Sequence, residues 1–167
     1  LAVFTAQGYA GDLAVGIGVH SGITAHYVLA YGSEEQKKYW LPLMATGEVL
    51  SAIGMTEPGA GSDLKALRTT AVRDGDHWVI NGAKQFISGA GDNDLYVTMV
   101  RTGDDGPKGI STLVIPKDAP GLSFGKVEHK MGWHMQATRQ VIFEDCKVPA
   151  ENLLSGEGAG FKIAMAG

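Results

Sequence analysis

The sequence predicts an α+β chain in which helices come first, an antiparallel all-β body follows, and another helix begins at the end. Two observations carry this prediction. The first residues are rich in alanine and other apolar residues, and from Val49 short alternating segments separated by glycine-rich turns replace the helical pattern. We therefore expect the end of a helical domain over residues 1–48, a β-domain over 49–155 and the start of a second helical domain over 156–167.

Residues 1–31 have a helical composition that is interrupted at an expected turn near Gly8 and Gly11. From residue 13 to residue 31 there is no charged side chain, which would allow a membrane-spanning helix. Glycines, hydroxyl groups and His20 and His26 interrupt this stretch, and no lysine or arginine flanks it. These features favour a helix buried among other helices. A signal peptide is not expected either, because the basic leading region that it needs is absent.

A second helix is expected directly after Ser33. Ser33 followed by Gln36 is a capping-box signal, and two glutamates occupy the first turn, where the helix dipole favours negative charge. We expect Pro42 to disturb this helix and Gly47 to end it.

The β-domain is expected to contain short strands joined by tight turns. Hairpin signals are the Asp-Gly pair at 74–75 and the Asn-Gly pair at 81–82, and residues 103–108 form a polar hairpin loop. This spacing is typical of an antiparallel sandwich or barrel. The expected strands are 67–73, 77–80, 85–88, 95–101, 110–115, 122–128 and 139–144.

Composition and charge exclude several classes of function. The net charge of −4 is spread along the chain, whereas a nucleic-acid groove needs a basic surplus. The single cysteine, Cys146, cannot form an internal disulfide, and we expect it to pack as a small apolar residue. His129 and His134 lack an accompanying carboxylate cluster, so no metal site is expected.

The two ends of the sequence indicate a piece of a longer protein. Residue 1 is Leu rather than Met, and the chain stops just as an amphipathic pattern begins near Phe161. We therefore expect an internal fragment.

The most unusual segment is Met-Thr-Glu-Pro-Gly-Ala-Gly-Ser-Asp at residues 55–63. A strand is expected to end at Thr56, after which Gly59 and Gly61 allow the chain to turn and expose N–H groups that could cradle a phosphate or the polar edge of a ring. The dinucleotide-binding pattern would need glycine at Leu64, and the P-loop and nucleophile-elbow patterns fail as well. From the pattern alone, a strained turn and a ligand-binding loop both stay open.

A second candidate segment ends the expected strand 85–88. Phe86 could pack against a flat ring while Ser88 reaches its polar edge; alternatively, Phe86 belongs to the core and Ser88 to a turn. Arg139 could bind an anion or form a structural ion pair.

Together, four ordered motifs resemble the acyl-CoA dehydrogenase family over nearly the whole chain. They are residues 55–63, Asn-Gly-Ala-Lys-Gln-Phe-Ile-Ser at 81–88, Thr-Arg at 138–139 leading into Val-Ile-Phe-Glu-Asp at 141–145, and Gly-Glu-Gly-Ala-Gly-Phe at 156–161. The finer texture, including Lys-Met-Gly-Trp at 130–133, is similar to the branch of the family that acts on isobutyryl-CoA.

The resemblance implies a middle β-barrel between two helical bundles, FAD at the interface and a homotetramer. It implies main-chain contacts to the flavin from residues 53–56, with FAD phosphates and acyl-CoA near Gly61 and Ser62. Many relatives carry tryptophan where this chain has Phe86 and an aromatic residue where it has Ile53. The implied cofactor-binding residues are Ile53, Met55, Thr56, Gly61, Ser62, Phe86, Ile87 and Ser88, of which Ser62 also binds substrate.

The family's reaction is a concerted α,β-dehydrogenation, in which a Glu removes the α-proton of an acyl-CoA and hydride passes to the flavin. That Glu belongs to the C-terminal helical bundle, so no residue of this chain is expected to be catalytic. The resemblance implies a short, branched acyl-CoA as substrate, electron-transferring flavoprotein as acceptor, and a location in the mitochondrial matrix or bacterial cytoplasm. The alternatives are an oxidase that uses oxygen and a flavin-binding relative that binds DNA or acts as a scaffold.

Overall fold

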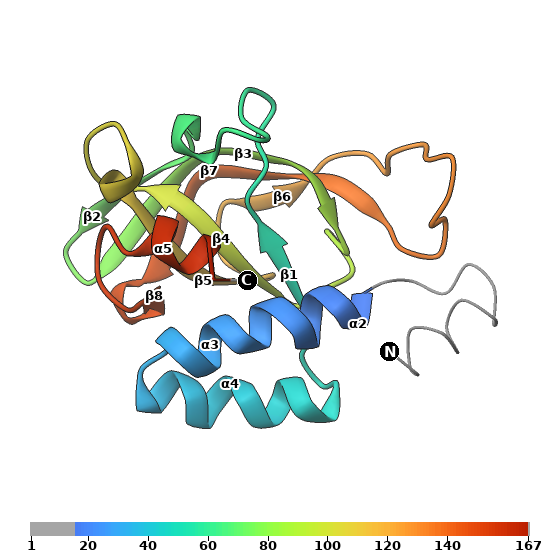
Figure 1. The fold of residues 1–167 in the computed structure, drawn as a ribbon, viewed down its shortest axis with the longest axis horizontal. Coiled ribbons are helices and arrows are strands. Elements are labelled where there is room, and N and C mark those ends of the chain that lie inside the picture. Colours follow the sequence, from blue (N-terminus) through green and yellow to red (C-terminus); the bar gives the residue numbers. More distant parts are fainter. Residues whose placement is uncertain (1–15, 167) are drawn as a thin grey trace.

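The computed structural model describes residues 16–166 and places three helices along one side of a β-domain (Figure 1). The helices are α2 (Gly16–Val19), α3 (Ala25–Tyr31) and α4 (Glu34–Thr46), and a π-helical segment, His20–Thr24, joins the first two. The expected turn near Gly8 and Gly11 lies outside the described residues. Within 16–166, no helix combines the length and apolar composition needed to cross a membrane.

Helix α4 begins and ends as the sequence predicts. The Ser33 hydroxyl accepts from the Gln36 amide, the Gln36 side chain accepts from the Ser33 amide, and Gly47 ends the helix at φ 78°. The expected disturbance at Pro42 is wrong, because the helix runs through it. Proline removes one hydrogen bond, and we attribute the tolerance to the caps and to Gln36, whose amide donates 2.6 Å to the carbonyl of Glu151 in the β-domain.

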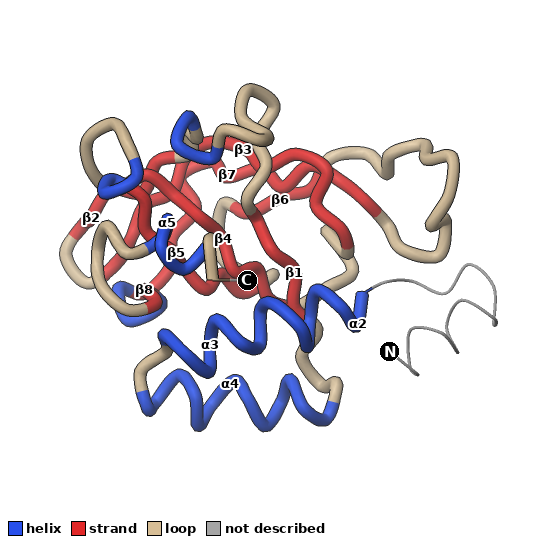
Figure 2. Tube along the Cα trace, viewed as in Figure 1, coloured by secondary structure: helices blue, strands red, loops and turns tan. Residues whose placement is uncertain are grey.

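Eight strands form one sheet in the order β6-β7-β3-β2-β4-β5-β8, with β1 paired to β4 (Figures 1 and 2). Most neighbours are antiparallel, but β4 pairs in parallel with β1 and β2. In the described part of the chain, β6 and β8 do not pair, so the sheet does not close into the expected barrel, while the α+β class is confirmed. The strands are β1 (Ser51–Gly54), β2 (Thr70–Asp74), β3 (His77–Ser88), β4 (Leu95–Arg101), β5 (Ile110–Pro116), β6 (Leu122–Phe124), β7 (Thr138–Pro149) and β8 (Leu153–Leu154).

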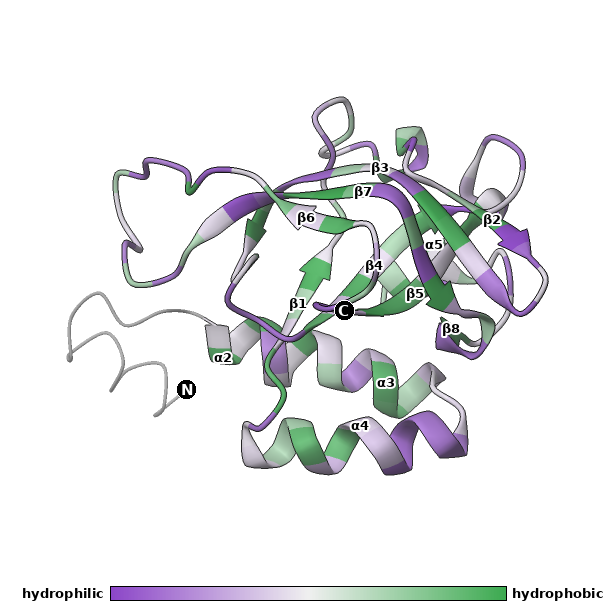
Figure 3. Ribbon diagram, turned by 180° about the vertical axis from the view of Figure 1, so that it is seen from behind, coloured by the Kyte–Doolittle hydropathy of each residue, from purple (hydrophilic) through white to green (hydrophobic). Residues whose placement is uncertain are grey.

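Strands β4 and β5 are buried on both faces and divide the core into two clusters. Alternate residues such as Tyr96 and Leu113 join a cluster built with β3 and β7, whereas Val97 and Val114 join a cluster that includes Tyr27 of α3. A short helix, α5 (Gly160–Ala164), adds Ile163 to the second cluster. In Figure 3, β4 and β5 are coloured as mostly hydrophobic, whereas the start of α4 is hydrophilic.

Strands β1 and β2 lie in line along the same edge of β4. Gly54 pairs with Thr98, and Thr70, which is the next chain residue in the sheet on that edge, pairs with Arg101. Residues 55–69 leave the sheet between these two pairings. The glycine at 54 is required here, because a Cβ would lie 2.8 Å from the Thr98 hydroxyl.

The expected hairpin at residues 74–75 is confirmed, but the one at 81–82 is wrong. Asp74 pairs with His77 across a turn that contains Gly75 at φ 60°. Strand β3, by contrast, continues through Asn81 and Gly82, so the two strands expected at 77–80 and 85–88 are its two ends. A bulge replaces the turn, since residues 144 and 145 of β7 lie opposite Asn81 alone.

The other strand bounds differ by a few residues. The strand at 95–101 is confirmed, the one expected at 122–128 is shorter, the one expected at 139–144 is longer, and β8 was not expected. Cys146 of β7 is buried among apolar residues as predicted, and burial raises the pKa of its thiol to about 11.

Candidate functional site

The structure brings the two candidate segments together at the ends of β1 and β3. The Gln85 amide donates to the Thr56 carbonyl at 2.7 Å, which joins the chain leaving β1 to the second half of β3. Ile53, Met55 and Thr56 are all partly exposed at this junction. Gly61 and Ser62 lie further along the segment 55–69 that leaves the sheet, called the loop below, and both are exposed.

Phe86 has a conformation that is unusual for its type. Its φ of 58° lies in the left-handed region, and 62% of the residue is exposed. It sits in a bulge in which Gln85 and Phe86 lie opposite the single residue Gln140 of β7. The alternative that placed Phe86 in the core is therefore wrong, because the bulge turns its ring outward.

The two residues after Phe86 return to the regular sheet. Ile87 is 3% exposed and joins the core, while Ser88 is half-buried and pairs with Thr138 of β7. Arg139 pairs with Ile87 in the sheet and lies 4.0 Å from the Asp92 carboxylate, which makes a long ion pair.

A buried ion pair, not anticipated from the sequence, joins the loop to β3. The Lys84 ammonium lies 2.7 Å from Glu57 Oε1, and the two side chains are 0% and 6% exposed. Burial raises the pKa of Glu57, but the Lys84 charge and the hydrogen bonds to the carboxylate outweigh it, so the pKa lies below its ordinary value. Burial lowers the pKa of Lys84 to about 8, although Glu57 opposes that shift. Both groups are therefore charged at neutral pH.

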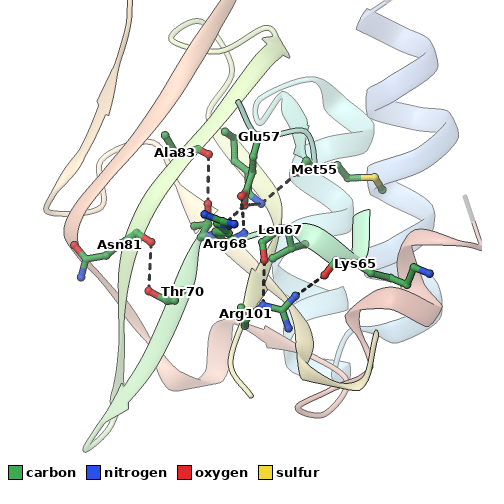
Figure 4. A network of polar contacts seen from close by, with 11 residues as sticks. Met55, Glu57, Lys65, Leu67, Arg68, Thr70, Asn81, Ala83 and Arg101 are labelled. Atoms are coloured by element: carbon green, nitrogen blue, oxygen red, sulfur yellow. Dashed lines mark hydrogen bonds and ion pairs between the residues drawn. The ribbon is translucent and has the colours of Figure 1, made fainter. Parts of the chain in front are cut away.

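The Glu57 carboxylate also holds the far end of the loop (Figure 4). It accepts from the Arg68 amide at 2.6 Å and from the Thr69 amide at 3.0 Å. Lys84 donates in addition to the Met55 carbonyl at 3.3 Å. Since every carboxylate oxygen of Glu57 has a partner, this residue is an anchor and not a free base.

Arg101, at the end of β4, fixes the middle of the same loop. Its Nε donates to the Leu67 carbonyl at 3.0 Å and its Nη2 to the Lys65 carbonyl at 2.7 Å (Figure 4). A shallow groove runs between the loop and β3. It is lined by Glu57, Pro58, Gly59, Ala66, Arg68, Thr69, Gly82 and Ala83.

The start of β1 is tied to the helices through His20. Its Nε2 donates to the Met44 carbonyl at 3.0 Å, which leaves Nδ1 to accept from the Ser51 amide at 3.1 Å. The Ser51 hydroxyl also contacts Nδ1 at 2.8 Å and the Thr24 hydroxyl. These contacts fix the first residue of β1, the strand that leads into the loop, relative to the helices.

This arrangement suits a flat, polar-edged ring better than a metal ion. The exposed Phe86 and the partly exposed Thr56 and Ser88 belong to the two segments that the Gln85–Thr56 hydrogen bond joins at the end of β1. Over residues 16–166, no group of three or more His, Cys, Asp or Glu side chains is placed to hold a metal ion.

Comparisons with known proteins agree on one family. The model of the acyl-CoA dehydrogenase middle domain matches residues 52–146, and that of the N-terminal domain matches residues 1–48. The mitochondrial isobutyryl-CoA dehydrogenase of Dictyostelium discoideum is 53% identical over 89% of this chain and 36% of its own length. The Bos taurus enzyme of the same name is 54% identical over 82% of this chain and 33% of its own.

A solved structure agrees with the sequence comparisons. The acyl-CoA dehydrogenase from Geobacillus kaustophilus superposes with a TM-score of 0.89 at 48% identity, over 93% of this chain and 41% of that one. The chain thus spans about a third of the length of the curated relatives it matches, at 36% and 33%.

Proposed function

The chain belongs to the acyl-CoA dehydrogenase family, and on that premise we propose that it supplies the FAD- and acyl-CoA-binding part of an acyl-CoA dehydrogenase. The reaction is the α,β-dehydrogenation of a short acyl-CoA to the 2-enoyl-CoA. The family matches at 1–48 and 52–146 also support a helical part over 1–48 and a β-domain over 49–155, and helix α5 supports the start of a helical part over 156–167.

The observation that carries this proposal is the outward ring of Phe86 beside the end of β1. A phenylalanine with a φ of 58° and 62% exposure stabilises neither its strand nor the core, which indicates that its place is set by a partner. FAD, when bound, supplies the ring that accepts the hydride. The described residues are compatible with it, because the Gln85–Thr56 hydrogen bond brings the segment that carries Phe86 and Ser88 next to the segment that carries Thr56.

Each candidate residue has a proposed role in binding. The main chain of Ile53 and Met55 lies against the flavin, and the Thr56 hydroxyl donates to its polar edge. Phe86 packs beside the ring and excludes water from it, and Ser88, next to the core residue Ile87, hydrogen-bonds the edge. With FAD bound, such donors would stabilise negative charge on the ring.

Gly61 and Ser62 are proposed to contact the FAD phosphates and the acyl-CoA. Apart from its two chain neighbours, no residue has an atom within 4 Å of a Cβ built on Gly61, and the φ of Gly61 is not in the left-handed region. Folding therefore does not require glycine at this position, whereas close approach of a ligand to the main chain would. Ser62 adds an exposed hydroxyl for the substrate.

We assign proton abstraction to a carboxylate outside residues 1–167. Glu57 is the one carboxylate buried at the site, and its oxygens are engaged by Lys84, Arg68 and Thr69. The isolated chain, supplied with FAD, isobutyryl-CoA and an artificial electron acceptor, should show no sustained reduction of the acceptor. Turnover dependent on acyl-CoA would place the base within this chain.

The finer assignments rest on relatives. A short branched substrate is supported by the two isobutyryl-CoA dehydrogenases, whose names also support a mitochondrial location if the source is eukaryotic. For a bacterial source, the proposed location is the cytoplasm. Electron-transferring flavoprotein is the proposed acceptor and a homotetramer the proposed assembly. One similar solved structure, 45% identical with a TM-score of 0.88, is described as the electron transferring flavoprotein of Acidaminococcus fermentans.

Substrate and acceptor are tested together in the holoenzyme. Reduction of the bound flavin by isobutyryl-, butyryl- and octanoyl-CoA is followed by loss of its visible absorbance, without and with oxygen. Fastest bleaching by isobutyryl-CoA and slow reoxidation by oxygen support the assignment. Rapid reoxidation by oxygen would identify an oxidase, and bleaching by none of the thioesters would refute dehydrogenation of short acyl-CoA.

A further inference from the structure

The two segments that we propose to face the flavin are not joined by the ladder of the sheet. Strand β1 pairs with β4, whereas β3 pairs with β2 and β7. Among the described residues, the main-chain link between them is the single hydrogen bond from Gln85 to Thr56. The remaining connection runs through side chains, and its centre is the pair formed by Glu57 and Lys84.

This pair holds the two ends of the 55–69 loop together through three main-chain contacts, at Met55, Arg68 and Thr69. Glu57 lies at the start of the loop and accepts from the amides of Arg68 and Thr69 at its end. Lys84, which belongs to β3, binds Glu57 and also donates to the Met55 carbonyl at 3.3 Å. Lys84 directly precedes the bulge that turns Phe86 outward, so one contact sets both segments relative to each other.

We propose that Glu57 and Lys84 are positioning residues for the cofactor, which hold the chain at 53–56 and the bulge at 85–86 as one preformed flavin-binding surface. The inference rests on the proposed function and deepens it. Neither side chain is exposed enough to bind ligand directly, so both act through the main chain that they fix.

Stability alone does not account for the pair. Removing two charges from water costs free energy that their attraction offsets only with good geometry, and apolar replacements of such pairs are often neutral or stabilising. Here the two charged groups make four hydrogen bonds, one to each other, two to amides and one to a carbonyl. Three of the partners are main-chain atoms of one loop, which is the pattern expected of a device that fixes loop geometry.

The test compares Lys84→Met with Lys37→Met in the full-length enzyme. Lys84→Met keeps the length of the side chain and removes the charge, and Lys37→Met removes the exposed ion pair with Glu34 in α4. Affinity is measured by titrating the apo-enzyme with FAD and following quenching of flavin fluorescence, at a temperature where circular dichroism shows all variants folded. We expect the Kd for FAD to rise about tenfold or more in Lys84→Met and to stay unchanged in Lys37→Met.

Glu57→Gln and the double variant Glu57→Gln/Lys84→Met test whether the pair acts as a unit. The double variant should bind FAD no more weakly than Lys84→Met, because one positioning contact cannot be lost twice. The visible absorption band of residual bound flavin should shift, since its polar edge meets altered donors. FAD affinity within about twofold of the parent, with only a lower melting temperature, would reduce the pair to a structural role.

Hydrogen exchange of the unaltered enzyme keeps the inference testable if Lys84→Met does not fold. An opening that releases the Arg68 and Thr69 amides should abolish FAD binding, so saturating FAD must slow exchange at both, but not at the Lys37 amide of α4. Equal exchange with and without FAD would overturn the inference. If the parent itself binds no FAD, the proposed function fails instead.

Discussion

Replacing Phe86 with glycine should make the apo-protein more stable than replacing it with alanine. Both variants lose the same ring, so its contacts cancel in the comparison. Alanine keeps a Cβ in the left-handed region at φ 58°, which costs about 1–2 kcal/mol, whereas glycine avoids that cost but loses about 0.5–1 kcal/mol through its freer unfolded chain. The difference leaves about 0.5–1 kcal/mol in favour of Phe86→Gly.

Urea unfolding of the two variants, monitored by circular dichroism, measures this difference directly. Phe143 in the neighbouring strand β7 is the control, since it is 2% exposed and lacks a positive φ. There glycine should be the worse replacement, by about 0.5–1 kcal/mol relative to alanine. If Phe86→Gly is also less stable than Phe86→Ala, the left-handed conformation does not persist in solution and the argument for an outward ring falls with it.

Both Phe86 variants should bind FAD more weakly than the parent, whatever their stability. Phe86 is 62% exposed and therefore available to a flat partner. If Phe86→Gly is more stable than Phe86→Ala and both bind FAD more weakly than the parent, the strain at this position is retained for function.

The remaining predictions concern three other positions. Thr56→Ala should weaken FAD retention or slow flavin bleaching by substrate, through loss of a hydroxyl partner worth about 0.5–1.5 kcal/mol; unchanged flavin content and bleaching would argue against that role. Gly61→Val should reduce FAD affinity more than Ser62→Ala while leaving the melting temperature near that of the parent, because no residue apart from its two chain neighbours has an atom within 4 Å of the added Cβ; equal retention of FAD by the two variants would show that the loop is not a close-packed ligand cradle. The Cys146 thiol, whose pKa burial raises from 9.0 to about 11, keeps its proton in the folded state when the unfolded chain has lost it. Its contribution to stability is therefore complete below pH 9.0 and is lost between pH 9.0 and about 11, with a slope of at most about 1.4 kcal/mol per pH unit. Cys146→Ala should remove this part of the alkaline destabilisation, and identical slopes in parent and variant would contradict it.

Local signals in the sequence were sufficient where the structure is itself local. The capping box of Ser33 and Gln36, the end of α4 at Gly47 and the turn at Gly75 all depend on neighbours within a few residues. The strand at 95–101 was predicted as one of several short segments separated by glycine-rich turns, and its bounds are confirmed. Such elements need no knowledge of the rest of the fold.

Local signals failed where a distant partner decides the conformation. The Asn-Gly pair at 81–82 has the composition of a turn, yet the Asn81 side chain donates 3.0 Å to the Asp145 carboxylate, and the strand continues with a bulge. Nothing near Glu57 in the sequence identifies Lys84 as its partner, 27 residues away. The left-handed Phe86 carries no signal either, because phenylalanine is not a residue that prefers this conformation.

The placement of β1 and β2 in line along β4 has a consequence for how this fold accommodates change. On β4 the partners of Gly54 and Thr70 are Thr98 and Arg101, only about 10 Å apart at the usual rise per residue, although the two strands are separated in the chain by residues 55–69. The sheet thus specifies where this excursion leaves and returns, but not its length or composition. Exchanges at its exposed residues 58–59 and 61–63, away from the Glu57 anchor and the buried Ala60 and Leu67, would leave the strand registers unchanged. For protein engineering, this makes the exposed part of the excursion exchangeable on a fixed frame.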